Sequence, residues 1–105
     1  MSPPVSRSDR RFMQQGAAEA AAMLRTLGHE QRLLVLCLLV AHGERTVGQL
    51  LEDVELSQSA LSQHLARMRE DGLVAARREG QCVHYRIADP RVATLVAALK
   101  SVFCP

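Results

Sequence analysis

The polar side chains that follow Leu56 have the types and spacing needed to bind DNA. Ser57 is a typical helix N-cap, and Leu61, Leu65 and Met68 then recur at nearly helical spacing, which predicts an amphipathic helix. Hydroxyl, amide and guanidinium groups can bond both base edges and phosphates. Such groups make up the other face of the expected helix: Gln58, Ser59, Ser62, Gln63, Arg67 and Arg69. The sequence therefore predicts a DNA recognition helix here.

A basic hairpin is expected directly after this helix. Residues 73–78 and 82–87 flank Glu79-Gly80-Gln81, and apolar and polar residues alternate in the second run. Basic side chains stand on both sides of the turn: Arg77, Arg78, His84 and Arg86. The clustering of arginines beside the recognition helix favours phosphate contacts over a merely solvated face. His84 is expected to be a phosphate or solvent contact rather than a metal ligand.

The elements that must position these residues can be read from periodicity and caps. An alanine-rich helix is expected over 12–27, and an apolar one over 29–41, which should be the central buried helix. Thr46 with Gln49 fits a capping box at the start of a short third helix. Asp89-Pro90 starts a last helix with a long apolar stripe. The fold class predicted is mainly α with a small β-hairpin: a winged helix-turn-helix.

Composition narrows the class of protein further. Residues 1–11 contain two prolines and three arginines, which predicts a flexible basic tail, and residues 12–105 form one domain. The net charge of +2 does not by itself imply nucleic acid. There is no signal-peptide core and no run of about 18 apolar residues, so a cytoplasmic protein is expected. Three cysteines are too few for a secreted disulfide scaffold, so they begin as thiols.

The order of elements and two segments resemble the ArsR/SmtB family of bacterial repressors. The segments are LRTLGHEQRLLVLCLL and SQSALSQHLARMREDGLV, and the resemblance covers roughly residues 17–104. It implies a symmetric homodimer joined through the first and last helices, which binds a double-stranded operator with an inverted repeat and releases it on a chemical signal. It also implies that the major groove is contacted by Gln58, Ser59, Ser62, Gln63 and His64. The wing tip around Gln81 would lie near the minor groove.

The chain departs from the metal sensors of that family. Where those carry a cysteine-rich motif, this chain reads QLLEDVEL, without cysteine or histidine. The last helix, DPRVATLVAALK, offers only Asp89 of the Asp and His ligands that other members use. Zinc or arsenite needs several thiolate or imidazole ligands held together. No metal and no other cofactor is therefore expected.

The positions of Cys37 and Cys104 resemble those in a subgroup of sulfide-responsive, persulfide-sensing repressors. In that subgroup the two cysteines face one another within a subunit, and reactive sulfur converts them to a disulfide or polysulfide bridge that releases the operator. The resemblance thus implies a redox switch at Cys37 and Cys104, without enzymatic activity. A thiolate with a lowered pKa is required. Only Arg32 or His29 stands out in sequence as a group that could lower the pKa of Cys37.

Other interpretations stay open from residue types alone. A cysteine in an apolar run, such as Cys37, is most often a small core residue, and Cys82 is expected to be an incidental exposed thiol. A peroxide-responsive disulfide would use the same thiols as a persulfide sensor. A metal-sensing regulator, a DNA-binding architectural protein and a thiol oxidoreductase are weaker alternatives. The last lacks a C-x-x-C motif.

Overall fold

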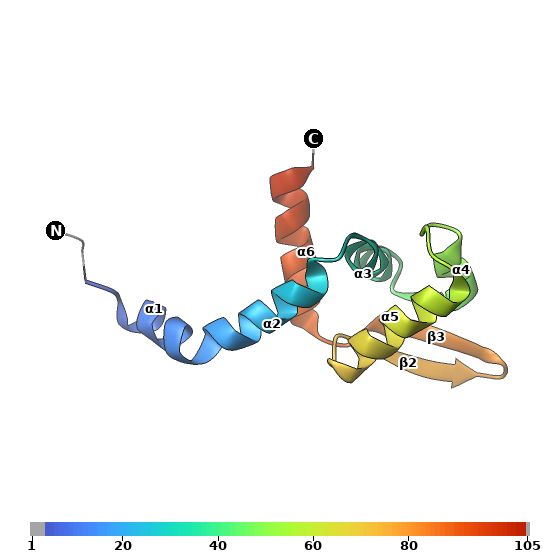
Figure 1. The fold of residues 1–105 in the computed structure, drawn as a ribbon, viewed down its shortest axis with the longest axis horizontal. Coiled ribbons are helices and arrows are strands. Elements are labelled where there is room, and N and C mark those ends of the chain that lie inside the picture. Colours follow the sequence, from blue (N-terminus) through green and yellow to red (C-terminus); the bar gives the residue numbers. More distant parts are fainter. Residues whose placement is uncertain (1–3, 105) are drawn as a thin grey trace.

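The computed structural model describes residues 4–104 as a helical protein with one small sheet. Helices α1 and α2 run outward from the rest of the chain, while α3, α4 and α5 lie beside the sheet (Figure 1). Helix α6 crosses the C-terminal part of α2 (Figure 1). The elements are α1 (Arg7–Arg11), the π-helical turn η1 (Phe12–Gly16), α2 (Ala17–Leu27), α3 (Glu30–His42), β1 (Glu44–Thr46), α4 (Val47–Leu51), α5 (Gln58–Glu70), β2 (Val74–Glu79), β3 (Cys82–Ile87) and α6 (Pro90–Phe103).

The N-terminal segment contains a short helix that its composition did not predict. Arg7–Arg11 is helical, and residues 1–3 lie outside the described residues, so the flexibility predicted for residues 1–11 stays a prediction. The Ser6 hydroxyl accepts a hydrogen bond from the Asp9 amide at 3.1 Å and so caps this helix. Asp9 in the first turn and the arginines in the last turn suit the helix dipole. These local signals outweigh the prolines and the charge.

The hydrophobic core lies between α3 and α5. Val35, Leu36 and Leu39 of α3 are buried and pack with Leu61 and Leu65 of α5 in one cluster. The other apolar residues of α3 are only partly buried, and Val40 is exposed. The expectation of a helix buried all round is therefore wrong for α3, because one side of it faces out of this single chain.

The caps of the helix-turn-helix are formed as the sequence predicts. The Thr46 hydroxyl accepts from the Gln49 amide at 3.2 Å, and the Gln49 side chain accepts from the Thr46 amide at 3.0 Å. The Ser57 hydroxyl accepts from the Ala60 amide at 3.1 Å and starts α5. These bonds satisfy amides that a helix start leaves without partners. They define where both helices of the motif begin.

The hairpin is confirmed, and a third strand joins it. β2 pairs antiparallel with β3 from Val74↔Ile87 to Glu79↔Cys82, and the turn uses Gly80 with φ +62°. β1 pairs with the other edge of β3, so the strand order is β1-β3-β2. The fold is a winged helix-turn-helix. Among residues 4–104 no helix has the length and apolar character to cross a membrane.

Candidate nucleic-acid interface

The recognition helix α5 presents a polar open face. Leu61, Leu65 and Met68 are fully buried, which turns the opposite side of the helix outward. Four of the residues predicted to contact DNA are exposed on the outward part of α5: Gln58, Ser59, Ser62 and Gln63. Ala66, also exposed, adds only a methyl group and so permits close approach. The geometry suits a helix that lies in a major groove.

His64 lies on a different side of α5 from these residues. It is half-buried, and its Nδ1 accepts a hydrogen bond from the Arg32 Nε at 2.9 Å. Its ring centroid lies 4.7 Å from that of His29. Burial, and then the charges of Arg32 and His29, lower the pKa of His64. A neutral His64 thus joins α5 to α3, and the predicted major-groove contact by His64 stays a prediction. Sequence reasoning did not find Arg32 as its partner.

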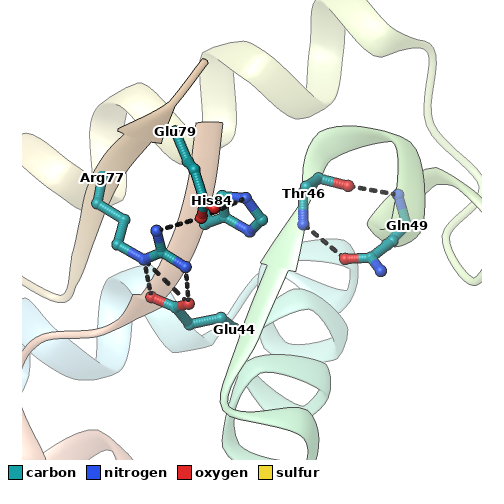
Figure 2. A network of polar contacts seen from close by, with 6 residues as sticks. All are labelled: Glu44, Thr46, Gln49, Arg77, Glu79 and His84. Atoms are coloured by element: carbon teal, nitrogen blue, oxygen red, sulfur yellow. Dashed lines mark hydrogen bonds and ion pairs between the residues drawn. The ribbon is translucent and has the colours of Figure 1, made fainter. Parts of the chain in front are cut away.

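Arg77 holds the wing to strand β1 (Figure 2). Its Nε and Nη2 donate to the two carboxylate oxygens of Glu44 at 2.9 and 2.8 Å, and its Nη1 donates to Glu79 at 2.8 Å. His84 Nε2 lies 3.9 Å from the same Glu79 carboxylate. The Arg77 guanidinium lowers the pKa of Glu44 and of Glu79. The β1–β3–β2 sheet is therefore clamped by charge on one face.

The basic side chains of the wing are not equivalent. Arg77 and Arg78 are neighbours on a strand and point to opposite faces of the sheet. A phosphate bound by Arg77 would have to compete with the bidentate contact to Glu44. Arg78 is exposed and makes no ion pair among residues 4–104, and Gln81 is exposed at the tip. Among the residues that the structure describes, the Arg67 side chain has only a long contact to Asp71, at 3.8 Å. Arg67, Arg78 and Gln81 are thus more accessible for DNA than Arg77.

The three cysteines occupy very different positions, and all are thiols. Cys37 is partly buried on α3 against the core, Cys82 is exposed on β3, and Cys104 is exposed at the end of α6. Burial raises the pKa of Cys37, and the nearby Lys100 ammonium acts in the opposite direction. Arg32 contacts His64, and the cation that acts on the Cys37 thiol is Lys100. The sequence-based expectation for the charged neighbour of Cys37 is corrected accordingly.

Cys37 and Cys104 lie on two helices that contact each other, α3 and α6. The Lys100 carbonyl accepts a hydrogen bond from the Cys104 amide at 2.9 Å, so Cys104 lies one turn beyond Lys100 at the end of α6. Within residues 4–104, no group of three or more His, Cys, Asp or Glu side chains could hold a metal ion.

Comparison with known proteins places this arrangement among bacterial regulators. Residues 29–76 match the family described as "Bacterial regulatory protein, arsR family". The HTH-type transcriptional regulator YgaV of Escherichia coli is 43% identical over 93 residues, which cover 89% of this chain and 94% of that protein. The biofilm growth-associated repressor of Xylella fastidiosa is 40% identical over 102 residues, which cover 97% and 86%.

The solved structures agree with this relation. Reduced HlyU from Vibrio cholerae superposes with a TM-score of 0.82 at 41% identity, over 90% of this chain and 99% of that one. The repressor BigR from Xylella fastidiosa gives a TM-score of 0.85 at 41% identity, over 91% and 97%. Identity and coverage of this extent are far above what a shared fold alone requires. The chain belongs to the arsR family of bacterial regulatory proteins.

Proposed function

We propose that this protein is a dimeric, DNA-binding transcriptional repressor whose trigger is the oxidation of Cys37 and Cys104 by a persulfide. The observation that supports the proposal is the packing of α6, which ends at Cys104, against α3, which carries Cys37. A bond between Cys37 and Cys104 would tie α6 to α3, and α3 is the helix that holds His64 of the recognition helix. The thiols are thus connected to the DNA-reading helix through a single element.

DNA binding is supported by the open face of α5 and by the wing. Gln58, Ser59, Ser62 and Gln63 would contact base edges, and Arg67, Arg78 and Gln81 would contact the backbone. Two recognition helices of a dimer would enter successive major grooves about 34 to 36 Å apart. The relatives from X. fastidiosa and V. cholerae are named a repressor and an activator, respectively. We propose repression, in the cytoplasm and without enzymatic activity.

Dimerisation is supported by the apolar side chains that one chain leaves uncovered. They lie on η1, α2 and the end of α6, the elements that family resemblance assigns to the interface: Phe12, Met13, Leu24, Val102 and Phe103. Exposed apolar clusters of this kind mark protein–protein contacts in soluble proteins. A second copy of the chain would cover them with the same residues.

The redox step can be written from the positions of the thiols. Because burial raises the pKa of Cys37, the exposed Cys104 is the better first nucleophile. Its thiolate would take the outer sulfur of a persulfide RSSH and release the thiol RSH. The Cys37 thiolate would then attack the Cys104 sulfur and expel hydrogen sulfide. Two thiols and one RSSH thus give a disulfide, RSH and H2S. If a second RSSH first converts Cys37 to a persulfide, the attack of Cys37 on Cys104 gives a trisulfide bridge, with two RSH and one H2S as products.

The affinity of the protein for operator DNA, measured with and without persulfide, tests the proposed switch. A duplex selected from random sequences with the reduced protein serves as the probe in fluorescence anisotropy. Persulfide should weaken binding by the wild-type protein about 5- to 150-fold, as expected for a coupling of 1 to 3 kcal/mol. Cys37→Ser and Cys104→Ser should bind DNA normally and not respond, whereas Cys82→Ser should respond like the wild type. Normal dissociation of either Cys37→Ser or Cys104→Ser would disprove the proposed switch.

A further inference from the structure

A cavity of about 420 Å³ lies where the dimerisation helices meet the end of the recognition helix. Four guanidinium groups line it, each from a different element: Arg25 of α2, Arg32 of α3, Arg67 of α5 and Arg91 of α6. The carboxylates in the lining are Glu19 and Asp71. The cationic groups outnumber the anionic ones by two, and of the four arginines only Arg67 is also among the residues proposed to contact DNA.

Two of these arginines have no carboxylate partner among residues 4–104. Arg32 is half-buried, and within the described residues its one side-chain hydrogen bond runs from Nε to the neutral ring of His64, so both terminal nitrogens are available as donors. Arg25 is exposed and makes no side-chain hydrogen bond or ion pair within the same range. A partly buried guanidinium beside a neutral partner is an incomplete electrostatic arrangement. An anion in the cavity would complete it.

The other two arginines already have carboxylate partners. Arg91 donates from Nε and Nη2 to the largely buried Asp89 carboxylate at 3.1 and 2.7 Å, which fixes the position of its guanidinium, and its Nη1 donates to the exposed Glu19 at 2.8 Å. Arg67 lies 3.8 Å from Asp71, and both side chains are exposed. Because such an exposed ion pair contributes little net free energy, the Arg67 guanidinium can turn towards a ligand at small cost.

We propose that this cavity binds a tetrahedral oxyanion of the phosphate or sulfate class. Guanidinium groups present paired N–H donors that match two oxygens of such an ion, and four elements converge around the space. The bound ion would connect α2 and α6, which carry the proposed dimer contacts, with α3 and the end of α5. The same chemistry is found in a free inorganic ion and in a DNA phosphodiester.

Titration with sodium sulfate, followed in amide and arginine Nε–H NMR spectra of the full chain, tests the site. Sodium chloride at matched ionic strength serves as the reference. Sulfate should give saturable shifts at the Arg32 Nε–H and the Thr26 amide that chloride does not give. Arg32→Gln and Arg25→Gln should each weaken the affinity for sulfate about tenfold or more, as expected for a lost charge-assisted hydrogen bond. The same spectra report whether each variant is folded.

Arg10→Gln is the matched control, because it removes one arginine charge from α1, outside the cavity. It should leave the sulfate affinity unchanged. Shifts that do not saturate, or an equal loss of affinity in Arg10→Gln, would overturn the proposal.

Binding to a mixed-sequence duplex in chloride buffer then identifies the source of the oxyanion. An unchanged salt dependence in Arg25→Gln and Arg32→Gln means that the cavity takes a free ion. A slope reduced by about one means that it takes a DNA phosphate. Both results support an oxyanion site, provided that sulfate saturates it.

Discussion

The DNA-reading part of the molecule, α3 to β3, has a closed hydrophobic core within one chain. The helical arm, made of η1, α2 and the end of α6, has apolar side chains that no other part of residues 4–104 covers. Leu61, Leu65 and Met68 of the recognition helix are fully buried, but Phe12, Val102 and Phe103 are exposed at 57, 72 and 76%. The winged unit therefore has its own core, while η1, α2 and the end of α6 lack a covering surface. Cys37 lies on α3, partly buried against the core, and Cys104 lies at the end of α6. The proposed switch thus joins a region that is rigid to one that depends on assembly.

The largest expected effect comes from breaking the core of the reading unit. Leu65→Ala leaves a cavity between α5 and α3 and should lower the free energy of unfolding by about 2 to 5 kcal/mol. Ser62→Ala, three residues away on the open face, should change it by no more than about 0.5 kcal/mol. Urea unfolding followed by circular dichroism measures both. Similar values for the two variants would mean that this region is not the independent core.

A carboxylate introduced on the helical arm should weaken dimerisation, whereas the same charge on α5 should weaken only DNA binding. Leu24→Glu would place a carboxylate in the proposed interface and should raise the dimer dissociation constant at least about tenfold, because the charge is desolvated there. Ala66→Glu puts the same charge on the exposed face of α5 and should weaken DNA binding without affecting the dimer. Sedimentation equilibrium and anisotropy report the two properties. Loss of the dimer in Ala66→Glu alone would reverse the assignment of the two regions.

Breaking the contact between Glu44 of β1 and Arg77 of the wing should have a smaller effect on DNA binding. Glu44→Gln and Arg77→Gln each break the bidentate contact and should weaken DNA binding by a factor of a few, and the double variant should be no worse than either one. This non-additive result would identify Arg77 as a residue that positions the wing. If Arg77→Gln is much more damaging than Glu44→Gln and reduces the salt dependence by about one, Arg77 contacts a phosphate.

The smallest effect concerns pH and the contact between α3 and α5. The folded chain holds His64 with a pKa below the ordinary value of 6.5, so the unfolded chain binds this proton at a higher pH. Stability from the neutral His64 is therefore present above pH 6.5 and is lost as the pH falls towards the lowered pKa. Tm measured between neutral and mildly acidic pH should fall more in the wild type than in His64→Gln. Equal pH dependence would mean that His64 is not held in this way.

The local signals in the sequence predicted most of the secondary structure. Ser57, Thr46 and Asp89 each cap the helix that their residue types indicate, and Gly80 forms the hairpin turn. These features depend on neighbours within four residues, so a single sequence reveals them. The winged fold followed from their order and from the family resemblance.

What the sequence did not reveal depends on contacts between distant residues. Strand β1 is three residues long and is recognisable only by its pairing with β3. The Arg32–His64 and Glu44–Arg77 contacts join residues more than thirty positions apart, and nothing in their local pattern indicates a partner. For the same reason Lys100, whose charge acts on the Cys37 thiol, was not predicted. The sequence predicted the residue types at the site, but which of these residues contact one another depends on tertiary packing.

The central proposal is a bond between Cys37 and Cys104 formed by reactive sulfur, and intact mass with peptide mapping tests it most directly. The reduced protein is exposed separately to an organic persulfide and to peroxide, with Cys82→Ser as the control. We expect persulfide to produce a Cys37–Cys104 crosslink, either as a disulfide or with added sulfur mass, in both proteins. A crosslink formed by peroxide alone would indicate a peroxide sensor. Unmodified Cys37, or a crosslink that requires Cys82, would contradict the account.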